Sequence, residues 1–348
     1  MRRTCVELFA GGGGAALGLR AAGLHSLACV EGDAAACATL QANGFPARHA
    51  WIGTPPDGAD LPAWDAVGDG AVGCWLLWAS PPCQPYSRAG KQMGHSDGRD
   101  GWPATVEAIR TIRPAWFVIE NVVGFPAQEK AADLVAAGLC ASARVWDLDA
   151  VRYGLPSRRR RLFIIGRRDP GPMPRIPLFT HYAPEDEALI QGADGVREAL
   201  LAQMQRWVSM GEALPHLAST GHAGSGQAMY YTPEQTLGQA ESRPEMLDNP
   251  SPCVVCSEEK GTRARRATAW TYNGGPDRAA DAAFMATGRR RLEPEEVAVL
   301  VGFPTTHRFM GNKGQVYRQI GNAVAPIMAQ RIVQAILLCD GINNSEKE

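Results

Sequence analysis

Short apolar runs alternate with helix-like stretches along the first half of the chain. Six runs have the length and apolar content of buried strands: Thr4 to Phe9, Ser26 to Val30, Val72 to Ala79, Ala115 to Glu120, Ala143 to Leu148 and Leu162 to Gly166. Helical spacing of apolar residues is found between them, at Ala15 to Ala22, Asp33 to Asn43, Ala104 to Ile112 and Gln128 to Ala137. This alternation predicts an α/β fold with a doubly wound, mostly parallel sheet and helices on both faces.

The pattern changes after Gly166. A proline-rich stretch follows at Pro170, Pro172, Pro174 and Pro177. Because proline continues neither a helix nor a central strand, we place a domain boundary there. We expect one domain over residues 1–170, a smaller irregular domain over 171–285, a return to the first domain over 286–340 and a disordered tail over 341–348. Helical periodicity returns at Glu293 to Val301 and at Pro326 to Leu338.

Composition narrows the class of protein. Of 348 residues, 45% are apolar and 20% are charged, as in ordinary globular proteins. No apolar run reaches the roughly 18 residues of a membrane-spanning helix, and Met1-Arg2-Arg3 opens no signal region, so we expect no membrane association and a cytoplasmic location. Nine scattered cysteines argue against a disulfide framework.

The net charge of -1 does not indicate a nucleic-acid partner. The arginines are nevertheless clustered, at Arg158 to Arg161, Arg263 to Arg266 and Arg289 to Arg291. Local patches of this kind matter more for such a partner than the total charge does.

A glycine-rich turn joins the first predicted strand to the first helix. Phe9-Ala10 is followed by Gly11, Gly12, Gly13 and Gly14, and Glu31 ends the next strand 20 residues after Gly11. Glycines let the backbone approach a ligand, and an acid at this distance can accept hydrogen bonds from a ribose. The pattern favours a nucleoside cofactor over an ordinary tight turn, and it leaves a dinucleotide and S-adenosylmethionine both open.

A candidate nucleophile follows the third predicted strand. The stretch Ser80-Pro81-Pro82-Cys83-Gln84-Pro85-Tyr86-Ser87 lies where parallel sheets bind ligands, and two prolines stiffen the turn that presents the thiol. Cys83 could equally be a small buried apolar residue, as most free cysteines are.

With these residues the chain resembles the cytosine-5 DNA methyltransferases. The nucleophile motif of that family is matched by Pro82, Cys83, Gln84 and Ser87, and its cofactor loop by Phe9, Gly11, Gly13 and Gly14. Its other motifs are matched by Glu120-Asn121-Val122, by Arg159 and Arg161 behind Tyr153-Gly154-Leu155-Pro156, and by Gln319-Ile320-Gly321-Asn322. The matches occur in the family's order and span residues 7 to 324.

The resemblance implies S-adenosylmethionine as the cofactor, bound by Phe9, Gly11, Gly13, Gly14, Glu31, Pro82 and Asn322. It implies that the Cys83 thiolate adds to carbon 6 of a cytosine, so that carbon 5 can take the methyl group. Glu120, supported by Asn121, would share a proton with ring nitrogen 3. Arg161 would bind the base carbonyl, and Arg159 the thiolate region or a phosphate. Alternation along a strand predicts that Arg159 and Arg161 share one face, with Arg158 and Arg160 on the other.

The resemblance also implies double-stranded DNA as the partner. A cytosine inside a duplex is out of reach, so it must be flipped out. Gln84, Ser87 and Arg88 are the substrate-loop residues, and we expect the polar loop between Arg88 and Gly101 to close over the DNA, in preference to a plain surface loop. The 171–285 domain would recognise the target sequence. We expect a monomer that can be paired with a cognate restriction endonuclease.

Several residues depart from the family pattern. Glu7 replaces the usual Asp of the first motif, and Cys253 stands where Thr is expected. The acid that reads adenine is unassigned, since Ala50 and Trp51 occupy its neighbourhood and Asp57 and Asp60 follow some way on. The pair Cys253 and Cys256 lacks a second pair with zinc spacing, so we expect no metal. Thr236-Leu237 is a weak match to a target-recognition element.

Three alternatives remain open from the sequence. The tRNA-cytosine branch of the family carries a Cys-Phe-Thr element that this chain lacks, which favours DNA. An enzyme acting on free nucleotides would not need a separate recognition domain. A catalytically silent DNA-binding relative is disfavoured by the intact Cys83, Glu120, Arg161 and glycine turn.

Overall fold

A seven-stranded sheet forms the centre of the molecule. The computed structural model describes residues 3–53, 69–82, 101–186, 203–215, 229–231, 250–251 and 289–345. The strands are β1 (Thr4–Leu8), β2 (His25–Glu31), β3 (Ala47–His49), β4 (Leu76–Ala79), β5 (Trp116–Asn121), β6 (Ser142–Asp149) and β7 (Arg160–Arg167). Their order is β3-β2-β1-β4-β5-β7-β6, and all neighbouring pairs are parallel except those that β7 makes with β5 and β6. The predicted doubly wound, mostly parallel sheet is confirmed.

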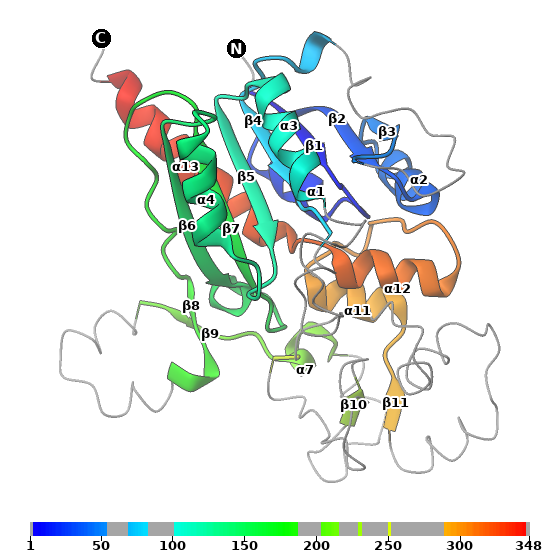
Figure 1. The fold of residues 1–348 in the computed structure, drawn as a ribbon. Coiled ribbons are helices and arrows are strands. Elements are labelled where there is room, and N and C mark those ends of the chain that lie inside the picture. Colours follow the sequence, from blue (N-terminus) through cyan, green and yellow to red (C-terminus); the bar gives the residue numbers. More distant parts are fainter. Residues whose placement is uncertain are drawn as a thin grey trace.

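Helices cover both faces of this sheet (Figure 1). On one face, α1 (Gly14–Ala21) and α13 (Pro326–Ser345) share an apolar core with Trp78 and Val118. On the other, α3 (Trp102–Ile112) and α4 (Ala127–Ala136) pack against Leu8 and Phe117. Strand residues therefore alternate between two buried layers, which is why these strands read as nearly continuous apolar runs.

The remaining described elements are short or peripheral. They are α2 (Ala34–Ala42), α7 (Met210–Ala213), α11 (Pro294–Val301), α12 (Lys313–Asn322), the 3₁₀ turns η2 (Asp69–Ala71), η4 (Ala150–Tyr153) and η5 (Pro184–Asp186), and the strands β8 (His181–Tyr182), β9 (Gln205–Arg206), β10 (Met229–Tyr231) and β11 (Arg289–Arg291). Most of 171–285 lies outside the described residues, so the division into domains stays a prediction.

Two boundaries differ most from those predicted. Only Leu76–Ala79 of the run from Val72 is a strand, because the turn that precedes it leaves Val72 58% exposed. The tail was expected to be disordered from residue 341, but α13 continues to Ser345. Asp340 anchors this end of the helix, since its carboxylate accepts hydrogen bonds from the indole nitrogens of Trp75 (2.9 Å) and Trp116 (3.2 Å).

Among the described residues, one helical stretch, Lys313–Gly341, which runs through α12 and α13, contains an 18-residue window apolar enough to cross a membrane, with a mean hydropathy of 1.4. Of that window, 50% is buried inside the protein. Ile332, Val333 and Ile336 are completely buried in the core beside α1. The apolar character of this stretch is therefore that of a core helix.

All six cysteines in the described ranges are buried free thiols: Cys5, Cys29, Cys37, Cys74, Cys140 and Cys339.

Candidate active site

The glycine turn follows β1 with a backbone conformation that residues other than glycine rarely adopt. Phe9, Gly11 and Gly13 have positive φ angles of 57°, 53° and 86°. Gly13 is the N-cap of α1, and its N–H donates to the Ala10 carbonyl at 3.0 Å. The turn therefore presents the N-terminus of α1 at the carboxyl edge of the sheet.

Glu31, at the end of β2, is built into this turn. One carboxylate oxygen accepts from the Gly11 N–H at 2.7 Å, and the other from the Asp33 N–H at 2.8 Å. Burial raises the pKa of Glu31, and these N–H groups offset the rise only in part. A carboxylate has about four acceptor positions, so both oxygens keep capacity for a ligand hydroxyl.

Gly14 brings the C-terminal motif against the same turn. A Cβ built at Gly14 would lie 2.2 Å from the Val324 carbonyl oxygen, so only glycine fits this position. The segment after Asn322 thus packs on the first turn of α1, and the Asn322 side chain is exposed. One of the predicted ligand-binding glycines is consequently required by packing.

The beginning of the nucleophile stretch lies between the glycine turn and β5. The Asn121 side chain donates to the Pro81 carbonyl at 3.4 Å. A Cβ at Gly101 would lie 2.9 Å from both Phe9 and Pro82, which shows how closely these residues converge. Cys83, Gln84, Ser87 and Arg88 lie outside the described residues, as does the rest of the predicted loop before Gly101.

Glu120 occupies the end of β5 and is only 7% exposed. Its carboxylate pairs with Nε of Arg161 on the neighbouring strand β7 at 3.1 Å and accepts a hydrogen bond from the Ser80 hydroxyl. Burial raises the pKa of Glu120 even though Arg161, Arg159 and Ser80 all act to lower it. Glu120 is therefore a carboxyl group suited to holding a proton.

The four consecutive arginines divide as their alternation predicts. Arg160 pairs with Asp147 at 2.6 Å and is exposed, and Arg158 pairs with Glu185. Arg159 is 2% exposed, while the Arg161 side chain is 13% exposed.

Arg159 points to a partner that the sequence did not reveal. Its Nη2 donates to the Gly321 carbonyl at 2.9 Å and to the Ala323 carbonyl, at the C-terminus of α12. Its main-chain N–H donates to Asp149 at 2.9 Å. A guanidinium is favourable at a helix C-terminus, where carbonyl groups lack helical partners.

Sequence reasoning assigned no role to Ser80 or Asp149. Ser80 directly follows β4, the strand beside β5, so adjacency of the two strand ends could have placed it near Glu120. Asp149 ends β6 and offered no comparable signal.

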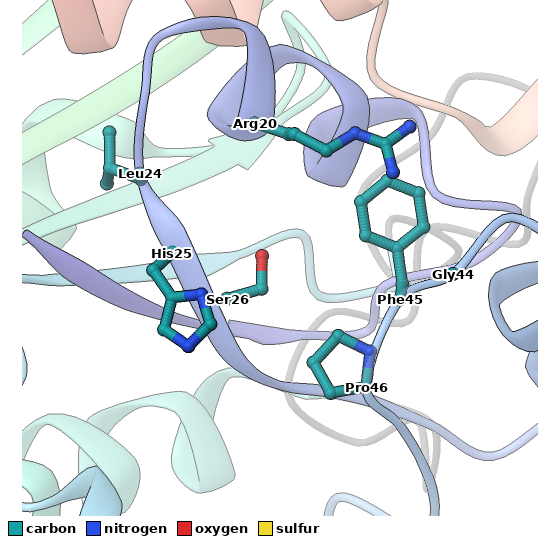
Figure 2. A pocket seen from close by; sticks show the side chains of 7 residues that line it. All are labelled: Arg20, Leu24, His25, Ser26, Gly44, Phe45 and Pro46. Carbon is teal, nitrogen blue, oxygen red and sulfur yellow. The ribbon is translucent and has the colours of Figure 1, made fainter. Parts of the chain in front are cut away.

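Two other features lie away from this site. Among the described residues no cluster of three or more His, Cys, Asp or Glu could hold a metal, and Cys253 and Cys256 fall outside those residues. A pocket lined by Arg20, Leu24, His25, Ser26, Gly44, Phe45 and Pro46 lies at the amino end of β2, whereas the site lies at the carboxyl ends of the strands (Figure 2).

Comparison with known proteins decides the family. A family model for C-5 cytosine-specific DNA methylase matches residues 3–338. The chain belongs to this family. Its relatives include the Type II methyltransferase M.PspPI of Psychrobacter sp. (strain TA137), which is 31% identical over 95% of this methylase and 78% of the relative. M.NgoMIV of Neisseria gonorrhoeae is 25% identical over 97% of this methylase and 98% of the relative.

Solved structures share the fold of this methylase at lower identity. A DNA modification methyltransferase encoded within an E. coli prophage has a TM-score of 0.57 and 20% identity, covering 97% of this methylase and 99% of that chain. The S. pombe Dnmt2 methyltransferase has a TM-score of 0.56 and 17% identity, covering 98% and 100%. Membership of the family makes this chain a cytosine-5 methyltransferase.

Proposed function

We propose that this methylase transfers a methyl group from S-adenosylmethionine to carbon 5 of a flipped cytosine in double-stranded DNA, with Cys83 as the nucleophile. The observation that carries the proposal is the buried pair of Glu120 and Arg161 beside the Ser80-Pro81-Pro82 turn, which leads directly to Cys83. A proton-holding carboxyl and a cation next to a thiol are what addition to a pyrimidine ring requires.

The residues around the glycine turn fit the proposed cofactor. A Cβ at Gly11 meets nothing within 4 Å, so the turn is open on that side. Glu31 can accept ribose hydroxyls, and the N-terminus of α1 can receive a carboxylate. Phe9, Gly13, Gly14, Pro82 and Asn322 complete the proposed binding set. When bound, S-adenosylmethionine supplies an electrophilic methyl group.

The position of Trp51 supports a binding place for the adenine ring of the cofactor. Trp51 follows β3, which pairs with β2, and a Cβ at Gly32 would lie 2.6 Å from its indole. The indole therefore covers the peptide next to Glu31, and we infer that adenine stacks there beside a ribose bound to Glu31.

Each residue of the site has its own role in the proposed chemistry. A bond forms between the Cys83 sulfur and carbon 6, and the electrons of the double bond move into the ring, where Glu120 provides the proton for nitrogen 3. Arg161 stabilises the ring carbonyl oxygen and Asn121 holds the nucleophile turn through Pro81. Carbon 5 would then accept the methyl group, with S-adenosylhomocysteine as the leaving group. Loss of the carbon 5 proton to a base, return of the nitrogen 3 proton to Glu120 and departure of the Cys83 thiolate would restore the aromatic ring.

We propose a narrower role for Arg159 than for Arg161. Because its Nη2 is bound to the carbonyls of Gly321 and Ala323, Arg159 fixes the C-terminus of α12 beside the site. Arg159 is thus a positioning residue that also helps to set the charge around Glu120.

The partners follow from the same proposal. The relatives are named Type II methyltransferases, which supports a cognate restriction endonuclease. We propose that residues 171–285 read the DNA sequence, that Gln84, Ser87 and Arg88 contact the DNA from a closing loop, and that the protein acts as a monomer in the cytoplasm.

A transfer assay with two nucleic acids tests the proposal. Purified protein and radiolabelled S-adenosylmethionine are incubated with unmethylated duplex DNA or with tRNA, and the Cys83→Ala variant is the control. We expect label in DNA alone, and none with Cys83→Ala, while cofactor binding is retained. Label in tRNA alone would favour the tRNA branch, and transfer by Cys83→Ala would overturn the mechanism. Bisulfite sequencing of DNA from expressing cells then reports the target site.

A further inference from the structure

The segment between α11 and α12 crosses over the glycine turn and passes beside α2 (Figure 1). We call residues 307–310 the strap. Its backbone is held on α2 by Asn43, whose side chain donates to the Arg308 carbonyl at 2.9 Å and accepts from the Arg308 N–H at 3.0 Å. Thr39 accepts from the Met310 N–H at 2.8 Å. The strap is therefore fixed to α2, on the side of the sheet that carries the proposed cofactor site.

His307 connects the strap to the glycine turn. Its Nε2 lies 2.9 Å from the Gly12 carbonyl oxygen, and because a carbonyl only accepts, Nε2 is the donor. The ring is held between Phe303 and Phe309, with centroid distances of 4.8 Å and 4.7 Å. Its Nδ1 is buried and has no hydrogen-bond partner among the described residues. His307 is thus fixed in one orientation and in one tautomer.

This contact acts on a peptide that is otherwise easy to turn. The Gly12–Gly13 peptide is flanked by two residues without Cβ, so its alternative orientation has little steric cost. A trans peptide holds its C=O and N–H on opposite sides. The Gly12 carbonyl is held by His307, and the Gly13 N–H by the Ala10 carbonyl at 3.0 Å. The two bonds together select a single orientation.

We propose that His307 is a positioning residue for cofactor binding, which fixes the Gly12–Gly13 peptide and so presets the glycine turn. The inference rests on the proposed function, since it assumes that S-adenosylmethionine binds at this turn. His307 touches no reacting atom. It lowers the free-energy cost of cofactor binding, because it removes conformations of the glycine turn that cannot bind the cofactor.

The protonation state of His307 gives the proposal a second readout. Burial and the nearby cation Arg20 lower the pKa of His307, although the bond to the Gly12 carbonyl opposes the shift. The ring is therefore neutral at neutral pH. Protonation would place a second N–H at Nδ1, where no acceptor is available among the described residues. Burial and Arg20 disfavour the protonated ring in this position, so acid should displace the ring and release the clamp, our name for the hydrogen bond from His307 to the Gly12 carbonyl.

Calorimetric titration with S-adenosylhomocysteine tests the proposal on three variants. His307→Phe keeps the ring packing but removes the donor, and we expect cofactor binding roughly 10-fold weaker, as for one lost hydrogen bond. His307→Gln keeps a donor near the position of Nε2 and should restore binding to within roughly 3-fold of the original. Asn43→Ala is the matched control, because it releases the strap from α2 without removing the bond to Gly12.

The outcomes separate the clamp from a purely structural role. If His307→Phe and Asn43→Ala lower the melting temperature equally but only His307→Phe weakens binding, the clamp is supported. Equal binding by His307→Phe and the unchanged protein, or equal weakening by both variants, would overturn it. An unchanged protein that binds no S-adenosylhomocysteine would instead overturn the proposed function.

A pH series adds a readout that packing alone would not move. As the pH falls below 6.5 and through the lowered pKa of His307, binding should weaken more in the unchanged protein than in His307→Gln, because the glutamine side chain does not titrate. Any contribution from Glu31 is common to both proteins and cancels in the comparison. Identical pH profiles for the two proteins would contradict the clamp.

Discussion

Two glutamates at the carboxyl edge of the sheet differ in what surrounds them. Glu31, at the end of β2, is held by main-chain N–H groups of Gly11 and Asp33. Glu120, at the end of β5, is held by side chains, the Arg161 guanidinium and the Ser80 hydroxyl. Burial raises the pKa of both carboxyls.

The difference indicates that the two glutamates have different functions. Both partners of Glu31 are donors fixed by the backbone, so its carboxylate is a rigid acceptor that shapes the glycine turn. The partners of Glu120 are side chains that can also contact a substrate, so its proton can be exchanged during a reaction. Binding and chemistry are thereby separated along one sheet edge, and substitutions at the two sites should fail in different ways.

Glu120→Gln should cause the largest loss. Glutamine keeps the size of the side chain but cannot give a proton to the ring, so we expect single-turnover methyl transfer to slow by about 10²- to 10⁴-fold. The affinity for S-adenosylhomocysteine should stay within about 2-fold, since Glu120 does not contact the glycine turn. Glu107→Gln, an exposed position on α3, is the matched control. Unimpaired transfer by Glu120→Gln would remove the distinction between the two glutamates.

Glu7 sharpens the comparison because its support is weaker. It lies on β1 between the two sites and is 2% exposed, and its carboxylate accepts a hydrogen bond from the Cys29 thiol at 3.9 Å. Burial and the neighbouring Glu31 raise the pKa of Glu7 to about 8. A raised carboxyl pKa means that the folded state retains a proton that the unfolded chain releases. The stabilising contribution is full below the unfolded value of 4.5 and is lost as the pH rises through about 8.

Glu7→Gln should therefore change the pH dependence of stability. Relative to the unchanged protein, its free energy of unfolding should rise by about 2–4 kcal/mol between pH 5 and pH 9, because glutamine does not lose a proton. Urea unfolding at several pH values measures the difference. A constant difference would show that Glu7 does not titrate in this range.

Much of this sheet edge could be predicted from the sequence. The ends of β2 and β5 follow from apolar runs that stop at the polar residues Glu31 and Glu120, and the end of β1 from the glycines that follow Phe9-Ala10. Two elements near this edge that escaped prediction are β3 and α12. The strand β3 has only three residues, Ala47–His49, with no apolar run, and only two of the four buried residues of α12, Val316 and Ile320, are aliphatic.

The partners of the site residues were harder to predict than the residues. Arg159 binds carbonyl groups more than 160 residues away, at Gly321 and Ala323, and no local pattern marks such a contact. The strap on Gly12 is similarly distant. Residues that bear chemistry are recognised by type and spacing, whereas those that position them depend on how segments far apart in the chain pack together.

Glu31→Gln should produce the opposite failure from Glu120→Gln. The amide cannot accept from both Gly11 and Asp33, so one N–H loses its acceptor and the turn loosens. We expect S-adenosylhomocysteine to bind roughly 10-fold more weakly, while transfer at saturating cofactor stays within about 3-fold. Calorimetry and single-turnover kinetics separate the two quantities. A slower transfer with unchanged affinity would reverse the assignment.

The smallest effect should come from Ser80→Ala. Removing the hydroxyl takes away a hydrogen bond that lowers the pKa of Glu120, so that pKa should rise further. Because the proposed role of Glu120 needs the protonated form, the limb of the rate profile that falls at high pH should move to higher pH. The rate at neutral pH should change by less than about 10-fold, as expected for one hydrogen bond. The indole of Trp78 also loses its acceptor, at 3.1 Å, but this loss affects stability and not the position of the limb. A limb that stays in place would mean that a group other than Glu120 carries the proton, and the contrast with Glu31 would then rest on geometry alone.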